Sequence, residues 1–553
     1  MQLCFPRAAL GALCAASALL LSACGGDDGP APDPSLVEVV RPTDQPCAIV
    51  ASTPASGAVN AAVNVETTVI YTGPSAGACR DLRLTDAAGS TVPTDTLFVN
   101  EWAHPDGGIV GTVSLQPKAD LRPAADFTVV RGQERLLSFR AGSTRAGLPV
   151  SAIDQPVRMT GLPQSSLVPV TQINRVLDML ALDLADGNET VAKALDWALS
   201  EELKRLAAPG ATYSARVKKL VYTSIQADGS PIQLSGLMVL PVQTDGNAPD
   251  YSRIPVMVSQ RGTQTNSAAP PSSAAQLASL LPGLLAAGKG HIYLVPDLIG
   301  VGDTAHLPQA YLVTKDTAAQ TRDMLLAART YIQQTYGTLP DRALRIMGIS
   351  QGGHSAMAAL PQLARLGSVK LVSAMAGPYD VQRTFSGTLN AIAGDPRDAY
   401  AAHEDLGFAP RFLAGSLEAL GAYQHYNYQP NRVFAADGTL LTSFLADFKA
   451  GRFGGLKAQW GASSMASNTQ RYIAPDAKVV LYHFSTDTRV PAQNTVDMLA
   501  RLKNGQHQLA SVDRGSCREK SVLTELVLQL SHSPLKTHTL CVVYQIDDLI
   551  AEL

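Results

Sequence analysis

Five short, uninterrupted apolar runs between residues 254 and 485 constrain the fold of this chain more than any other feature. Stretches with helical spacing separate most of them, for example "DTAAQTRDMLLAARTYIQQTYG". A strand that is apolar on both faces needs cover on both, so such strands alternating with helices predict a parallel sheet between two helical layers. The runs are "IPVMVSQ" (254–260), "HIYLVPD" (291–297), "ALRIMGIS" (343–350), "VKLVSAMAG" (369–377) and "AKVVLYHFS" (477–485).

A serine stands at the end of the third run, in "IMGISQGGHS", with a glycine two positions away on either side. The helical stretch "QGGHSAMAALPQLARLG" begins directly after it. A serine on a tight turn from strand to helix needs neighbours without side chains, because only then does its hydroxyl stand clear of the backbone. The motif alone also arises by chance, so its place between strand and helix is what makes Ser350, with Gly348 and Gly352, a candidate nucleophile motif.

A serine hydroxyl needs a base to take its proton and a carboxylate to orient that base. In a sheet of this kind both partners lie in loops after later strands, in the order serine, acid, histidine. Asp487 lies in the loop after the fifth run and Asp380 in the loop after the fourth, although an exposed aspartate in either loop could instead cap a helix. Further along, "SHSPLKTHTLCVVYQIDDLIAEL" offers His532 and His538 before a predicted helix.

Four ordered motifs make residues 217–553 resemble the α/β-hydrolase superfamily, in particular its secretory lipase and carboxylesterase branch. They are "PDLIGVGDT", "GISQGGH", "STDTRVP" and "KTHTLCVVYQIDDLI". The resemblance implies a doubly wound α/β-hydrolase sheet with Ser350 as nucleophile and Asp487 as acid. It favours His538 as base, because the histidine of this family stands close to a terminal helix. His532 and Asp380 stay open as alternatives for the base and the acid.

Acyl transfer also needs N–H donors aimed at the oxygen that becomes negative in the transition state. Gln351 supplies the backbone N–H directly after the nucleophile. The family commonly has His-Gly after the first run, where this chain has Arg261-Gly262-Thr263. We expect the backbone N–H of Gly262 or Thr263 to serve. Arg261 departs from the pattern and leaves two interpretations, contact with an acidic substrate group or a structural salt bridge.

Two other features are not expected to take part in the chemistry. His354 lies one helical turn beyond Ser350, which favours packing over a role as base. The loop "DLIGVGD" contains Asp297, Gly300 and Gly302 but lacks G-x-G-x-x-G, so it is no nucleotide fingerprint. Nothing in the sequence requires a cofactor or a metal.

The N-terminal segment predicts export. Arg7 precedes an apolar run from Ala8 to Leu21, too short for a membrane span and suited to a signal peptide. It ends in "LSAC", which resembles the lipobox of bacterial lipoprotein signals, so we expect cleavage after residue 23 and lipid on Cys24. A Gly/Pro/Asp-rich tether over 24–46 follows. The protein would then be anchored to the bacterial envelope, at the outer membrane in a Gram-negative cell, and an ordinary signal with secretion is the alternative.

Four cysteines remain beyond the signal, an even number in an exported chain. Cys47 and Cys79 lie in one region and Cys517 and Cys541 in another, which predicts two local disulfides, Cys47–Cys79 and Cys517–Cys541. Zinc ligation is the weaker alternative, because there is no C-x-x-C and no Cys/His cluster.

The remaining organisation follows from periodicity. Residues 47–145 alternate short apolar runs with turn residues, which predicts an all-β sandwich; "TPASGAVNAAVN" resembles bacterial Ig-like domains, with spacing as the expected role. Residues 146–216 are predicted as a helical transition segment, and Val217–Val242 as a hairpin around Asp228-Gly229 at the edge of the sheet. The stretch 380–476 is an insertion that could form a cap over the nucleophile or, equally, pack on the surface of the domain.

The formal net charge is −3 and 16% of the residues are charged, so no basic field is available for nucleic acid. The leading hypothesis is a serine hydrolase acting on a small-molecule or lipid-like carboxylic ester. A serine peptidase of the same fold and an inactive envelope-binding protein are the alternatives. The natural ester and the oligomeric state are beyond the sequence.

Overall fold

The computed structural model describes residues 47–553 except 104–106, 159–161, 163, 175–209, 266, 268, 396, 402–408, 518–535 and 540. The predicted signal peptide, Cys24, the tether, most of the helical transition segment and His532 lie outside the described residues. The described residues belong to one compact unit.

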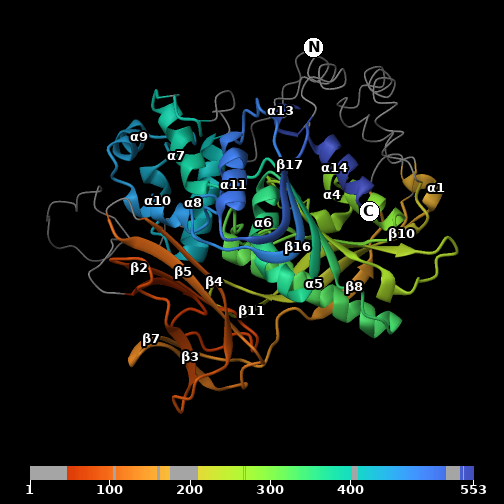
Figure 1. Cartoon of the computed structure of the whole chain (residues 1–553), viewed down its shortest axis with the longest axis horizontal. Coiled ribbons are helices and arrows are strands. Elements are labelled where there is room, and N and C mark those ends of the chain that lie inside the picture. Colours follow the sequence, from red (N-terminus) through yellow and green to blue (C-terminus); the bar gives the residue numbers. More distant parts are fainter. Residues whose placement is uncertain are drawn as a thin grey trace, which may run out of the picture. The chain divides into compact units, whose positions relative to one another are not determined.

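A mixed ten-stranded sheet organises this unit (Figure 1). Its strand order is β17-β16-β15-β14-β12-β13-β11-β10-β8, with β9 also pairing with β10. The pairs from β13 to β17 are parallel, and β11, β10, β8 and β9 pair antiparallel. The strands are β8 (Pro149–Asp154), β9 (Leu167–Val168), β10 (Ser214–Ile225), β11 (Pro231–Val242), β12 (Val256–Gln260), β13 (Ile292–Pro296), β14 (Ala343–Ile349), β15 (Ser368–Met375), β16 (Ile473–Tyr482) and β17 (Gln508–Arg514).

The five apolar runs form the parallel strands β12 to β16, as predicted. The expected hairpin forms β10 and β11, but it is not the edge of the sheet, because β8 pairs with β10 on the outside. The segment 146–216 is not helical throughout: its described part contains β8, β9, the first residues of β10 and the short helix α1 (Val170–Ile173). Most side chains of β8 are exposed, so the strand lacks the apolar signature that marked the central strands.

Helices cover both faces of the sheet, as the continuous apolar strands require (Figure 1). Leucines of α4 (Leu277–Gly288) and apolar residues of α14 (Val542–Ala551) pack in one core with Tyr293 and Tyr482. The opposite core contains side chains of α5 (Thr314–Tyr336), α6 (Gln351–Leu366) and α11 (Gln493–Asn504).

The insertion between β15 and β16 is helical and has its own aromatic core; we call this segment the cap. Its helices are α7 (Val381–Ile392), α8 (Ala409–Gln424), α9 (Thr442–Lys449) and α10 (Gly454–Gly461). Phe385 stacks on Trp460, and Phe444 and Phe448 pack beside them.

Residues 48–140 form two antiparallel sheets around a shared core. One sheet has the order β1-β2-β5-β4 and the other β3-β6-β7. The strands are β1 (Ala48–Thr53), β2 (Thr67–Gly73), β3 (Leu82–Asp86), β4 (Thr94–Ala103), β5 (Ile109–Pro117), β6 (Asp126–Arg131) and β7 (Glu134–Arg140).

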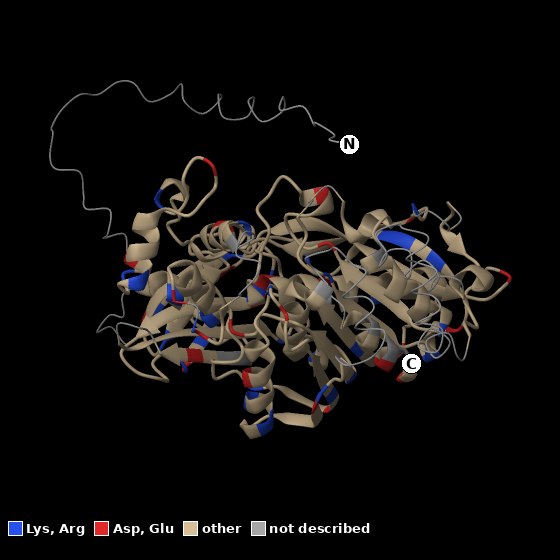
Figure 2. Ribbon diagram, turned by 90° about the horizontal axis from the view of Figure 1, so that it is seen from above, with Lys and Arg blue, Asp and Glu red and all other residues tan. Residues whose placement is uncertain are grey.

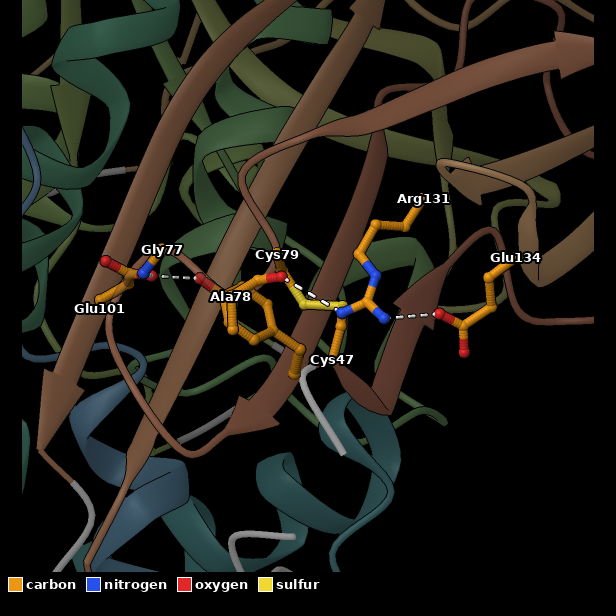
Figure 3. The surroundings of a disulfide bond; sticks show 8 residues. Cys47, Gly77, Ala78, Cys79, Glu101, Arg131 and Glu134 are labelled. Carbon is orange, nitrogen blue, oxygen red and sulfur yellow. Dashed lines mark hydrogen bonds and ion pairs between the residues drawn. A yellow bond between two sulfur atoms is a disulfide. The ribbon is translucent and has the colours of Figure 1, made fainter. Parts of the chain in front are cut away.

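The predicted disulfide Cys47–Cys79 is present in this region, with 5.4 Å between the Cα atoms. Figure 3 shows how the loop before Cys79 is held: Gly77 donates its N–H to Glu101 (2.6 Å), and Arg131 donates to the carbonyl of Ala78 (3.4 Å). The disulfide and these bonds tie the start of β1 to the loop between β2 and β3.

A buried charged cluster joins this β region to the helices of the large sheet. Glu66 accepts hydrogen bonds from Arg322 of α5 (3.2 Å) and Gln362 of α6 (2.7 Å). Arg322 also pairs with Asp323 at 2.8 Å. The β region thus packs on the large sheet through desolvated polar contacts.

Charged residues of both signs are interspersed over the described part of the chain (Figure 2). No helix among the described residues is both long and apolar enough to cross a membrane.

Candidate active site

Ser350 occupies the turn between β14 and α6 in a conformation that few non-glycine residues adopt, with φ 57° and ψ −122°. Its N–H donates to the carbonyl of Met375 on β15 (2.8 Å). A Cβ on Gly348 would lie 2.0 Å from the carbonyl oxygen of Gly352, and a Cβ on Gly352 would lie 2.0 Å from that of Gln260. Both positions therefore require glycine, which is the arrangement that the sequence motif predicts.

Asp487 and His538 are in contact, with 2.7 Å between the Asp487 Oδ2 and the His538 Nδ1. Asp487 lies in the loop after β16, and its Oδ1 accepts the N–H groups of Arg489 (2.9 Å) and Val490 (3.1 Å). His538 is in the short helix α13 (Lys536–Thr539), and both side chains are buried. The structure thus brings the predicted acid and base together.

The charge state of Asp487 follows from these contacts. Burial by itself would raise the pKa of this carboxyl, but its interactions with His538 and His483 bring the pKa below its usual value. Asp487 is therefore ionised at neutral pH and can only accept, so the His538 Nδ1 carries a proton towards it. The Nε2 of a neutral His538 is then available as a base.

His483 is a second histidine on Asp487 and was not among the residues predicted for the site. Its Nε2 lies 2.8 Å from the carbonyl oxygen of Val490 and 3.2 Å from the Asp487 Oδ2, and its Nδ1 lies 2.7 Å from the Thr495 hydroxyl. A carbonyl only accepts, so the Nε2 of His483 is the protonated nitrogen. His483 lies at the end of β16, four residues before Asp487. This short spacing is the one feature of the sequence that could have indicated their contact.

Asp380, the alternative acid, caps a helix. Its carboxylate accepts the N–H of Arg383 (2.9 Å) at the start of α7, and burial raises its pKa. It thus has the capping role that the sequence left open for an aspartate in this loop.

The predicted oxyanion donors flank Ser350 on two sides. Gln351 is the first residue of α6. A Cβ placed on Gly262, in the loop after β12, would lie 3.5 Å from the carbonyl oxygen of Ile349 and 4.0 Å from the Cβ of Ser350. Gly262, and Thr263 after it, are thus close enough to Ser350 to take part in one site.

Arg261 holds this loop through hydrogen bonds to main-chain carbonyl oxygens. Its side chain is buried, and burial lowers its pKa to about 10. The guanidinium donates to the carbonyl oxygens of Asp297 (3.1 Å) and Gly262 (3.0 Å). These contacts favour a structural role for Arg261. Within the part of the chain that the structure describes, the side chain is held by hydrogen bonds to main-chain carbonyl oxygens and not by a salt bridge.

Asp297 and His354 also make internal contacts. The Asp297 carboxylate accepts the Ser235 hydroxyl (2.5 Å) and the Ser272 N–H (2.9 Å). His354 is buried, and its Nε2 lies 3.0 Å from the carbonyl oxygen of Ser463 in the cap. His354 thus has the packing role expected of it.

The C-terminal segment is fastened at two points. The predicted disulfide Cys517–Cys541 is present, with 5.0 Å between Cα atoms. Gln545 of α14 donates to the carbonyl oxygens of Gly348 (3.2 Å) and Ser373 (2.9 Å). Among the described residues there is no group of three His, Cys, Asp or Glu side chains that could hold a metal ion.

No family model matches this chain, and no curated protein does. Two crystal structures of the rice cell wall degrading esterase LipA from Xanthomonas oryzae are similar to it at 17% sequence identity. One has a TM-score of 0.51 and covers 74% of this chain and 99% of that chain. The other has a TM-score of 0.50 and covers 72% and 97%. This likeness shows an α/β-hydrolase fold, which the sequence motifs predicted.

Proposed function

We propose that this protein is a serine hydrolase of carboxylic esters. The proposal rests on one observation above all: His538 is bonded to a buried, ionised Asp487, in a fold whose strand-to-helix turn carries Ser350. The resemblance of the motifs to secretory lipases and carboxylesterases points to the same chemistry, and the structurally similar LipA is an esterase.

In the proposed reaction the Ser350 Oγ attacks the ester carbonyl carbon while the His538 Nε2 takes the hydroxyl proton. Asp487 keeps the imidazole oriented and stabilises the imidazolium that forms. The oxyanion accepts the N–H of Gln351 and that of Gly262 or Thr263. The C–O bond then breaks, and His538 returns the proton to the leaving alcohol. Water, activated by His538, releases the acid from the acyl-enzyme.

We also propose that the chain is exported and anchored through lipid on Cys24, and that residues 47–145 are an Ig-like sandwich. The two disulfides fit an oxidising compartment. Detergent-dependent extraction and metabolic labelling with a fatty-acid analogue test the anchor, and Cys24→Ala should abolish the labelling.

Hydrolysis by a purified soluble form tests the function. We expect it to cleave short aryl esters, and Ser350→Ala should lower kcat roughly 10⁴- to 10⁶-fold. Unchanged hydrolysis in this variant would remove Ser350 from the mechanism. A panel of esters of increasing chain length and aminoacyl amides, run on one preparation, distinguishes an esterase from a lipase and a peptidase, and no turnover at all would favour the inactive envelope-binding protein.

A further inference from the structure

An aromatic side chain lies beside the proposed oxyanion loop. The hydroxyl of Tyr311, in the segment before α5, is 3.4 Å from the Thr263 hydroxyl. Thr263 follows Gly262, the residue whose backbone approaches Ser350. Tyr311 is thus connected to the nucleophile through a single loop.

The cap supplies a second ring. Phe412 of α8 stacks on Tyr311, with 6.5 Å between the ring centroids and 15° between the planes. Gly415, one turn further along α8, approaches the same ring: a Cβ there would lie 3.8 Å from the Tyr311 Cδ1. This stacked pair joins the cap to the loop that carries the proposed oxyanion donors.

Arg489 contributes a third planar group next to Phe412. The guanidinium carbon of Arg489 is 6.0 Å from the centre of the Phe412 ring, and Arg489 is the second residue after Asp487. Burial raises the pKa of Tyr311 to about 12, although its bond with Thr263 and the charges of Arg261 and Arg489 act against the rise. Tyr311, Phe412 and Arg489 therefore form one continuous group, which we call the planar wall, from the oxyanion loop to the acid loop.

The planar wall is accessible. Its three side chains are partly exposed, as are Ser350 and Gly262, whereas the aromatic rings at the centre of the cap are buried. Partly exposed aromatic residues between two loops of a proposed active site are available to a ligand.

We propose that the planar wall is a substrate subsite that selects esters carrying a flat aromatic ring next to the ester group. Aromatic rings gain from offset stacking on Phe and Tyr, and a guanidinium plane stacks on a ring in the same way. A saturated ring of the same size has no π-face and gains only from burial of its apolar surface. This inference rests on the proposed ester hydrolysis and adds the class of substrate to it.

The test compares ester pairs that differ only in the saturation of the ring. Benzyl acetate and cyclohexylmethyl acetate carry the ring on the alcohol; methyl phenylacetate and methyl cyclohexylacetate carry it on the acid. The measured quantity is the ratio of kcat/KM for the aromatic ester to that for the saturated ester. In the parent protein we expect a clear preference for the aromatic member of at least one pair, and that pair identifies the side of the ester that the planar wall contacts.

Phe412→Leu keeps an apolar side chain and removes the π-face, so the ratio should fall between about twofold and tenfold. Arg489→Lys keeps the charge and removes the plane, and should move the ratio in the same direction. Phe453→Leu, a like change within the aromatic core of the cap, is the matched control and should leave the ratio unaltered.

An unaltered ratio for both ester pairs in Phe412→Leu and in Arg489→Lys would overturn the subsite while leaving ester hydrolysis intact. If no ester is hydrolysed, the proposed function fails, and the subsite is then decided by binding. Saturation-transfer NMR of benzyl acetate against cyclohexylmethyl acetate should show preferential contact of the aromatic ester with the parent protein, reduced in Phe412→Leu. If benzyl acetate and cyclohexylmethyl acetate contact the parent protein equally, and Phe412→Leu equally as well, the subsite is overturned.

Discussion

Removal of the Arg322 guanidinium should cost much more stability than removal of an exposed arginine at the junction of the β region with the large sheet. The side chains of Arg322, Glu66 and Asp323 are only 8%, 4% and 0% exposed. Arg322→Met would leave two buried carboxylates without the cation between them. Breaking a buried pair in this way costs about 3–5 kcal/mol of the free energy of unfolding.

Urea unfolding measures this cost, followed by tryptophan fluorescence and by loss of ester hydrolysis. The matched control is Arg365→Met. Arg365 of α6 pairs with Asp95 of β4 across the same junction at 2.6 Å, but the two side chains are 41% and 40% exposed. An exposed pair contributes at most about 1 kcal/mol, so the control should unfold close to the parent.

Two further measurements probe the cause. Adding Glu66→Gln to Arg322→Met should recover part of the loss, because it removes one of the two uncompensated charges. Burial raises the pKa of Glu66 and Arg322 opposes the rise, so loss of Arg322 raises this pKa further. In the folded variant Glu66 then takes up a proton more readily. The difference in free energy of unfolding between the variant and the parent should therefore shrink as the pH falls. Equal losses in the two arginine variants, or no recovery with Glu66→Gln, would refute this reasoning.

Two other predictions concern the proposed site. Cys517→Ser opens a loop of 24 residues, which in the chain-entropy model costs roughly 3 kcal/mol. We expect faster thermal inactivation, with the β region still folded as judged by near-UV circular dichroism. An unchanged rate of inactivation would contradict this prediction. Asp487→Asn should lower kcat on the order of 10⁴-fold through loss of the His538 orientation. Because the pKa of Asp487 is lowered in the folded protein, its ionised form contributes stability above the unfolded pKa of about 3.9, and this contribution is lost as the pH falls through the folded pKa. The stability gap between variant and parent should therefore narrow in acid, and a constant gap from pH 7 to pH 3 would argue against the assigned charge.

The central sheet could be predicted because its strands are apolar on both faces and alternate with helices. Ser350 could be placed because Gly348 and Gly352 have no room for a side chain, a constraint visible in the motif. The outer strand β8 escaped prediction, since it is held by backbone pairing to β10 while most of its side chains face solvent.

Contacts between distant segments were also beyond the sequence. Glu66 and Arg322 are ordinary charged residues in their own segments, and only the packing of the two regions makes them a buried pair. Phe412 gave no sign that it would reach Tyr311, because aromatic residues in the insertion could equally have filled the core of the cap. His483 lies at the end of a correctly predicted strand, but its contact with Asp487 was not predicted.

The contact of Gln545 with the carbonyl oxygens of Gly348 and Ser373 has a consequence for the biosynthesis of the protein. The ribosome makes α14 and His538 after every strand of the large sheet that the structure describes, so the nucleophile, the acid and the oxyanion loop exist well before the base. If the proposed function holds, the nascent chain would therefore lack its base until α13 has been made. In that case hydrolysis would begin only when α14 docks against β14 and β15, so activity would depend on completion of the fold.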